Sequence, residues 1–250
     1  MAKNDEIKQI LLNTLKEIES YDRPNNENAQ REFNPNRNRE FRTEGRNDGN
    51  KIETQNYFKG IEDFLPNFDR KIICIFGLNM SGKTTLAKYI MRNFSSAVVF
   101  DVLREYDYNR YDVYQPKKVN YPEVAQEFDL FIDRVKDEPK WNLIVVDEAN
   151  RIFPNRKALF PRFRSFLDTY RHFNKTIMFI CRRPSQLFTD IPELAHYLIF
   201  FNLKGKNDIE YINSLNRNAG EVVYSLPKYH FVVMDMWRNF YICKPIPKNV

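Results

Sequence analysis

The residues best suited to phosphate chemistry lie between Gly77 and Thr84, where the sequence GLNMSGKT matches G-x-x-x-x-G-K-[ST] in full. Such a loop binds a polyphosphate for three reasons. Its glycines let the backbone come close to the phosphates, its backbone N–H groups point toward the phosphate oxygens, and the following helix presents the positive end of its dipole. The residues expected to bind the nucleotide are Gly77, Asn79, Met80, Ser81, Gly82, Lys83, Thr84 and Thr85. We expect Lys83 to reach the β- and γ-phosphates of ATP, and the Thr84 hydroxyl to bind Mg²⁺. A glycine-containing turn that matches by accident is the alternative.

Two adjacent carboxylates, Asp147 and Glu148, follow the apolar run LIVV at residues 143–146. This pattern is typical of a Walker B strand, in which Asp147 completes the metal shell and Glu148 is the general base that activates water. We expect this strand to lie beside the strand of the phosphate loop. A core strand that ends in a solvated acidic turn is the alternative, and the phosphate loop upstream disfavours it.

Phosphoryl transfer also needs positive charge at the γ-phosphate, which a neighbouring subunit can supply as an arginine finger. Arg171 precedes the apolar run 176–181, and Arg182 and Arg183 follow it. If that strand lies next to the Walker B strand, Arg182 comes close to the γ-phosphate of its own subunit. Arg171, near the end of a predicted helix, is better placed to cross a subunit interface. Each arginine could equally form a surface salt bridge. The expected catalytic residues are Lys83, Glu148, Arg171 and Arg182.

The elements that must position these residues alternate between strand and helix from Tyr57 onward. The alternation predicts an α/β fold with a mainly parallel sheet flanked by helices, and with the phosphate loop it predicts a P-loop NTPase domain over residues 56–250. Strands are expected at 72–76, 97–102, 141–147, 176–181, 197–203, 231–235 and 240–243, and the last two form a C-terminal β-hairpin. Helices are expected at 84–94, 122–136 and 156–173, and a tyrosine-rich loop at 104–118.

The first 55 residues differ in composition from the rest. Apolar residues recur there at spacings of three and four: Ile7, Ile10, Leu11, Leu15 and Ile18. This spacing predicts an amphipathic helix within residues 1–20. Residues 21–55 contain few apolar side chains and predict a flexible polar linker. Acidic residues nearly cancel its arginines, which favours a solvated tether over a DNA-binding arm.

The composition bounds the class of protein. A chain of 250 residues with 42% hydrophobic residues can form one good-sized domain with extensions. The formal charge of +6 suggests a polyanionic partner such as nucleic acid, although proteins that bind only ATP commonly have a basic surface as well. The three cysteines are too far apart for a disulfide framework or a zinc site and indicate a reducing cytoplasm. No apolar run approaches the length of about 18 residues that a membrane span needs, so no integral membrane segment is expected.

Several further motifs together resemble the HerA/FtsK superfamily of ring-forming, DNA-translocating ATPases, and within it the genome-packaging ATPases of viruses. The segments that carry the resemblance are VVFDVLREYDYN at 98–109, DEANRIFP at 147–154, TYRHFNKTIMFI at 169–180, CRRPSQL at 181–187, IPELAHYLIFFNL at 191–203 and SLPKYHFVVMD at 225–235. The family often has glutamine where this chain has Arg182. This departure weighs against the polar sensor role that the family implies at this position and allows Arg182 a charge-stabilising role instead.

The resemblance implies a P-loop NTPase of RecA-like (ASCE) type, an Mg²⁺-dependent ATPase that forms a pentameric or hexameric ring and drives double-stranded DNA into a viral procapsid. It implies a location in the host-cell cytoplasm or at the packaging vertex of the virion. The N-terminal extension is then a candidate docking segment for a portal, capsid or membrane protein. The candidate DNA contacts are the loop 104–118 and a basic run after the Walker B segment: Arg151, Arg156, Lys157, Arg162 and Arg164. A solvated or subunit-facing surface is an equal alternative for both.

A function from another class is also consistent with these motifs. An ATP-dependent assembly, extrusion or switch protein would act on protein partners without moving DNA, as in filamentous phage extrusion factors. Glu148 favours the hydrolase, because a binding switch gains nothing from a strong base.

Overall fold

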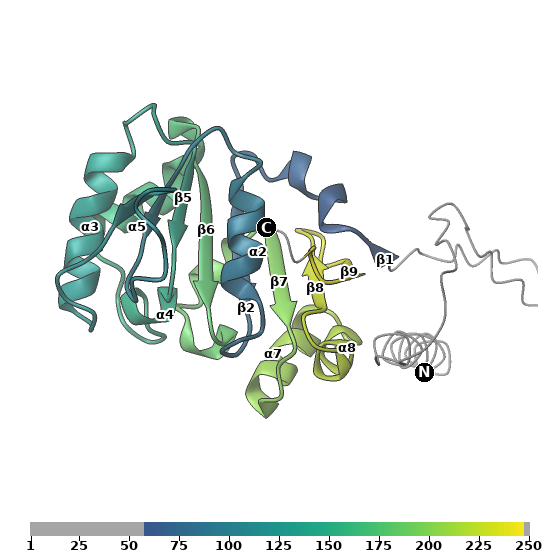
Figure 1. The fold of residues 1–250 in the computed structure, drawn as a ribbon. Helices are drawn as coiled ribbons and strands as arrows, with labels where there is room; N and C mark the ends of the chain where they lie inside the picture. Colours follow the sequence, from purple (N-terminus) through teal and green to yellow (C-terminus); the bar gives the residue numbers. More distant parts are fainter. Residues whose placement is uncertain (1–57, 248–250) are drawn as a thin grey trace, which may run out of the picture.

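The computed structural model describes residues 58–247, which form one nine-stranded sheet with helices on both faces (Figure 1). The predicted helix at 1–20 and linker at 21–55 lie outside the described residues. Along the sheet the strand order is β1-β9-β8-β7-β2-β6-β5-β3-β4. The strands are β1 (Phe58–Lys59), β2 (Ile72–Phe76), β3 (Ala97–Phe100), β4 (Asp112–Tyr114), β5 (Leu143–Val146), β6 (Thr176–Cys181), β7 (Tyr197–Phe201), β8 (Phe231–Met234) and β9 (Phe240–Cys243).

The predicted mainly parallel sheet is confirmed. Strand β2 pairs in parallel with β6 on one side and with β7 on the other, and β5, β3 and β4 continue the parallel part. The predicted C-terminal β-hairpin is also confirmed, because β8 runs antiparallel to β7 and β9 runs antiparallel to β8. Because the central strands run in parallel, their carboxyl ends meet at one edge of the sheet.

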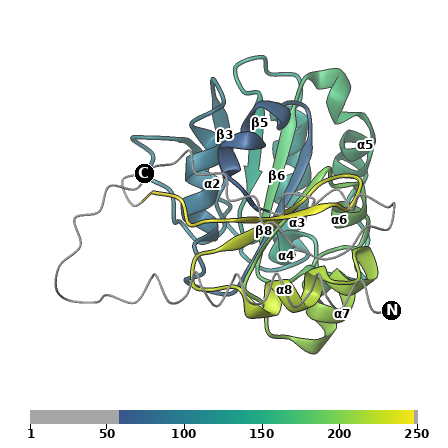
Figure 2. The ribbon, with the colours of Figure 1, turned by 90° about the vertical axis from the view of Figure 1, so that its right-hand side faces the viewer.

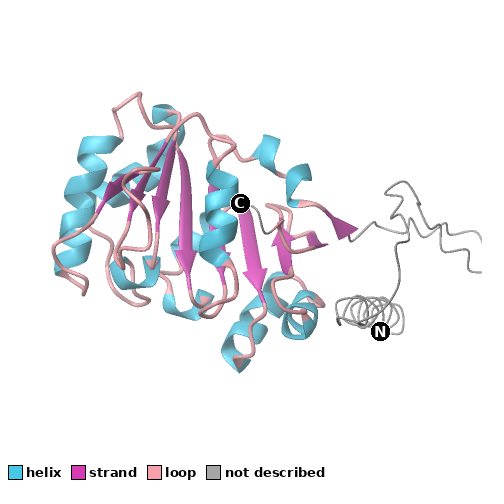
Figure 3. Cartoon of the chain, viewed as in Figure 1, coloured by secondary structure: helices cyan, strands magenta, loops and turns pink. Residues whose placement is uncertain are grey.

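Two hydrophobic layers cover the sheet, which explains why β2, β5, β6 and β8 are buried at every residue. Helix α2 (Lys83–Met91) and the single-turn helices within 61–67 pack on one face. The other face is covered by α3 (Glu123–Val135), α4 (Ala149–Ile152), α5 (Pro161–Thr169), α6 (Asp190–Leu194), α7 (Lys206–Leu215) and α8 (Ala219–Ser225). Figures 2 and 3 show this arrangement from two sides.

The prediction that the Walker B strand lies beside the phosphate-loop strand is wrong. Strand β6 lies between β5 and β2 and pairs with both. The apolar pattern of a buried strand is the same wherever the strand sits, so it identifies β5 as a sheet member without giving its neighbours.

Two predicted boundaries also need correction. Residues Asp112–Tyr114, expected to belong to a loop, form the edge strand β4 beside β3. The helix expected from Arg156 begins only at Pro161, because a proline in the helix interior would clash with the preceding turn and is tolerated at the first position. Helix α5 ends at Thr169, and a separate single turn covers Tyr170–Phe173.

Candidate nucleotide-binding site

The phosphate loop connects the end of β2 to the start of α2 at the carboxyl edge of the parallel strands. Gly77 is packed too tightly for a side chain, because an added Cβ would lie 2.5 Å from Ser81 Oγ and 2.8 Å from Phe201 Cβ. Gly82 has a φ of 106°, which L side chains rarely adopt. The Gly82 carbonyl accepts the first helical hydrogen bond, from the amide of Leu86 at 2.9 Å. The first-turn amides of α2 therefore remain available to an anion at the loop.

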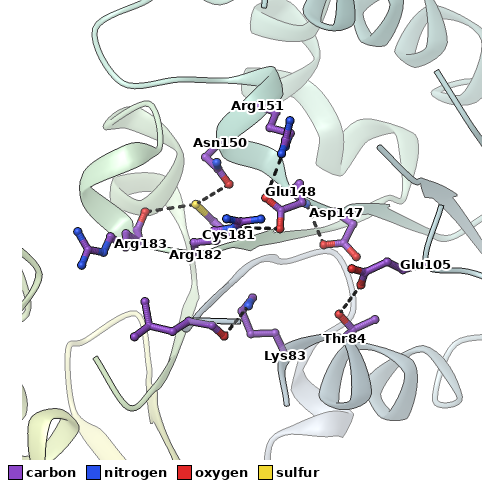
Figure 4. Close-up of polar contacts among 11 residues, drawn as sticks. Lys83, Thr84, Glu105, Asp147, Glu148, Asn150, Arg151, Cys181, Arg182 and Arg183 are labelled. Carbon is purple, nitrogen blue, oxygen red and sulfur yellow. Dashed lines mark hydrogen bonds and ion pairs between the residues drawn. The ribbon is translucent and has the colours of Figure 1, made fainter. Parts of the chain in front are cut away.

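Lys83 folds back across this loop. Its Nζ donates a hydrogen bond to the Leu78 carbonyl oxygen at 3.0 Å, and the side chain is largely buried (Figure 4). Burial lowers the pKa of Lys83, while the nearby carboxylates of Glu148 and Asp147 act in the opposite direction. The ammonium group thus lies between the phosphate loop and the two acids of the Walker B segment.

Oxygen ligands for a cation gather next to Thr84. Its hydroxyl donates to Glu105 Oε2 at 3.2 Å, and Glu105 lies between Thr84 and Asp147 in Figure 4. Asp147 Oδ1 accepts from the Glu148 amide at 2.8 Å, but Oδ2 has no hydrogen bond within residues 58–247. Burial raises the pKa of Asp147 to about 7, and the neighbouring carboxylates of Glu105, Glu148 and Asp101 add to the rise. The Thr84 hydroxyl and the carboxylates of Glu105 and Asp147 are hard oxygen donors of the kind that binds Mg²⁺.

Glu105 is a site residue that the sequence analysis did not assign. Its backbone amide donates to Asp101 Oδ1 at 3.0 Å, and the next amide, of Tyr106, donates to Oδ2 at 2.9 Å. Asp101 therefore holds the turn that directs Glu105 toward Thr84. The only sequence signal was the acidic residue four positions after Asp101 in VVFDVLREYDYN.

Glu148 is held by two arginines. Its Oε1 lies 3.2 Å from Nε of Arg182, at the end of β6, and its Oε2 lies 3.9 Å from Nε of Arg151, on α4. The Glu148 side chain is only 11% exposed, whereas the Arg182 side chain is 36% exposed. The structure therefore brings Lys83, Thr84, Asp147, Glu148 and Arg182 together at one edge of the sheet.

Arg171 lies at the opposite edge, in the turn before β6 begins. Its Nε donates to the Tyr170 hydroxyl at 3.1 Å, and its Nη2 contacts Nε2 of His196, just before β7. Burial, together with the charges of Arg171 and Lys71, lowers the pKa of His196 to about 4, so this imidazole is neutral at pH 7. Within one chain, Arg171 is therefore separated from the phosphate loop by the length of the sheet.

The candidate DNA-contact residues differ in their surroundings. Tyr106 is buried against Tyr111, with 5.8 Å between ring centroids. In the basic run, Arg162 lies 3.9 Å from Asp133, and Arg164 lies 3.8 Å from Asp190. The remaining exposed members of that run are Arg156 and Lys157.

A protein-family profile described as zonular occludens toxin (Zot) matches residues 61–226, which is well over half of the chain. The chain belongs to the Zot family. This Zot-family chain is similar to the genome packaging NTPase B204 from Sulfolobus turreted icosahedral virus 2, solved in complex with ATP-γ-S. The two chains are 22% identical, and they superpose with a TM-score of 0.59 over 71% of this chain and 98% of that chain. It is also similar to B204, the DNA-packaging ATPase from Sulfolobus turreted icosahedral virus, with 22% identity and a TM-score of 0.57 over the same shares of the two chains.

These comparisons confirm the predicted P-loop NTPase fold. A search of curated protein sequences finds no match to the Zot-family chain. Within residues 58–247, no helix combines the length and the apolar character needed to cross a bilayer.

Proposed function

We propose that this Zot-family chain is an Mg²⁺-dependent ATPase that converts ATP and water to ADP and phosphate. The observation that carries the proposal is the meeting of the phosphate loop with Asp147 and Glu148 at one edge of the sheet. Lys83 binds the β- and γ-phosphates in exchange for its bond to the Leu78 carbonyl. The Ser81 hydroxyl is buried without a hydrogen bond among the described residues, so it is available to a phosphate oxygen. Thr84 and Asp147 would hold Mg²⁺, with Glu105 beside them, and the bound ion would offset phosphate charge.

Glu148 accepts the proton of the attacking water in this proposal. Its pairing with Arg182 at 3.2 Å holds the carboxylate in place before nucleotide binds. Arg182 is exposed enough to turn toward the γ-phosphate of the same subunit, and this motion would release Glu148 toward the water. Arg171 would then supply a second positive charge from a neighbouring subunit in a pentameric or hexameric ring, since it lies far from its own phosphate loop.

The work done by hydrolysis is proposed to be translocation of double-stranded DNA, as in a viral genome-packaging motor. The fold likeness to the genome packaging NTPase B204 and the net charge of +6 support this proposal. Exposed Arg156 and Lys157, which follow the Walker B segment, are the residues we propose to contact DNA phosphates. Such a motor would work in the host-cell cytoplasm or at the packaging vertex, with residues 1–55 docking to a portal, capsid or membrane protein.

The alternative is an ATP-dependent assembly, extrusion or switch protein that acts on protein partners. One observation favours it: acidic side chains lie within 4 Å of Arg162 and Arg164, which reduces the positive charge of the basic run. In that case the exposed face of α5 would bind protein rather than DNA.

ATP turnover by the wild-type chain and Glu148→Gln, each with and without double-stranded DNA, tests both proposals. Protein concentration and salt are varied. The motor predicts turnover that rises with DNA, climbs more than linearly with protein and is lost in Glu148→Gln. Turnover that requires Glu148 but ignores DNA at every concentration would support the assembly protein. Tight ATP binding with negligible turnover would reject the ATPase and leave a nucleotide-dependent switch.

A further inference from the structure

Tyr229 lies beside the phosphate loop although it is far from it in the sequence. The Cδ1 atom of its ring would be 3.5 Å from a Cβ added to Gly82, and the Phe201 ring would be 3.3 Å from the same point. Phe201 is buried in the core, whereas Tyr229 is 45% exposed. An exposed aromatic ring therefore borders the phosphate loop at the start of α2.

The strand order gives the direction in which a nucleotide would extend from this loop. Strands β6 and β5 lie on one side of β2, and β7 and β8 lie on the other (Figure 1). Asp147 and Glu148 follow β5, so the γ-phosphate end of the nucleotide belongs on that side. The opposite end, which carries the base, then extends toward β7 and β8, where Tyr229 precedes β8.

The turn that carries Tyr229 has an unusual backbone conformation. Its backbone φ is 66°, in the left-handed region that is unusual for a bulky residue. The His230 amide donates to the Pro227 carbonyl at 3.2 Å, which closes the turn. Lys228 Nζ lies 4.8 Å from the ring centroid. A side chain kept in an uncommon backbone conformation next to a ligand loop is typical of a functional position.

We infer that Tyr229 is the platform on which the nucleotide base stacks. This inference rests on the proposed binding of ATP. Stacking uses the face of the base rather than its hydrogen-bonding edge, so it tolerates different bases and is stronger for the larger purines. The site should therefore accept ATP and GTP with similar affinity and bind CTP more weakly.

Binding titrations of the full chain with Mg²⁺ and ATP, GTP, CTP or inorganic tripolyphosphate test this inference. Tripolyphosphate has the phosphates but no base. Tyr229→Gly removes the ring and adopts a φ of 66° without strain, so it is expected to fold. It should lose about 10-fold in affinity for ATP, as expected when a stacking ring is removed, and keep the wild-type affinity for tripolyphosphate. Tyr229→Phe should bind ATP as the wild type does.

Tyr224→Ala is the matched control. Tyr224 is 49% exposed, and Lys204 Nζ lies 4.1 Å from its ring centroid, but it is on α8. This variant should bind ATP normally. The inference is overturned if Tyr229→Gly weakens ATP and tripolyphosphate equally, or weakens neither. A wild-type chain that binds neither ligand would instead overturn the proposed ATP site itself, and the stacking role with it.

Discussion

Replacing Asp147 with asparagine should stabilise the metal-free protein above neutral pH. The Asp147 carboxylate is 5% exposed, and burial raises its pKa from 3.8 to about 7, with further contributions from Glu105, Glu148 and Asp101. One pKa unit corresponds to about 1.4 kcal/mol, so ionising Asp147 in the folded state costs up to about 4 kcal/mol. Asparagine is neutral and nearly the same size, and its Oδ1 can still accept the Glu148 amide.

The sign of the pH dependence follows from the direction of this shift. Because the pKa of Asp147 is higher in the folded protein, the folded state holds more protons than the unfolded chain between about pH 4 and pH 7. The free energy of unfolding of the wild type should therefore fall as pH rises through that window, and the loss should be complete above it. The asparagine variant lacks this titration and should exceed the wild type in stability by about 2–4 kcal/mol at pH 8.

Urea unfolding in EDTA at pH 5, 6, 7 and 8 measures this difference. Asp133→Asn is the control, because Asp133 is 44% exposed and hydrogen bonding to Lys136 lowers its pKa. Adding Mg²⁺ should raise the stability of the wild type at pH 8 and leave the Asp147→Asn variant nearly unchanged, since the ion requires the carboxylate. If the asparagine variant is no more stable than the wild type at pH 8 in EDTA, the reasoning about buried charge is refuted.

Two further predictions concern the loop and the arginine beside it. Gly77→Ala should reduce ATP affinity by at least about 10-fold in a binding titration, because the new Cβ would meet Ser81 Oγ at 2.5 Å and Phe201 Cβ at 2.8 Å. Gly60→Ala, whose Cβ meets only the flexible end of a glutamate, should bind ATP normally, and equal losses in both would contradict the packing argument. Arg182→Gln should lower kcat for ATP by about 10²-fold with little change in ATP affinity, since it removes charge needed mainly in the transition state. An unchanged kcat in steady-state assays would exclude that role.

Much of the site follows from short stretches of sequence. The phosphate loop, the acids Asp147 and Glu148, and the strand Phe240–Cys243 were all identified from residues that are adjacent in the chain. An apolar run of four to six residues predicts a buried strand, and glycines at a set spacing predict a tight loop, because both depend on local backbone and burial preferences. The resemblance to viral packaging ATPases added the identity of the fold, which the comparisons confirm.

The sequence alone determined which residues carry the phosphate chemistry and which segments form the sheet. Only the tertiary structure decided that β6 separates β5 from β2, that Glu105 reaches Thr84, and that Tyr229 borders Gly82. The contact of Glu105 with Thr84 joins residues 21 positions apart, and that of Tyr229 with Gly82 joins residues 147 positions apart. Strand order and side-chain contacts across a sheet depend on how the helices pack over both faces, and a local pattern of apolar and polar residues is the same for several such packings.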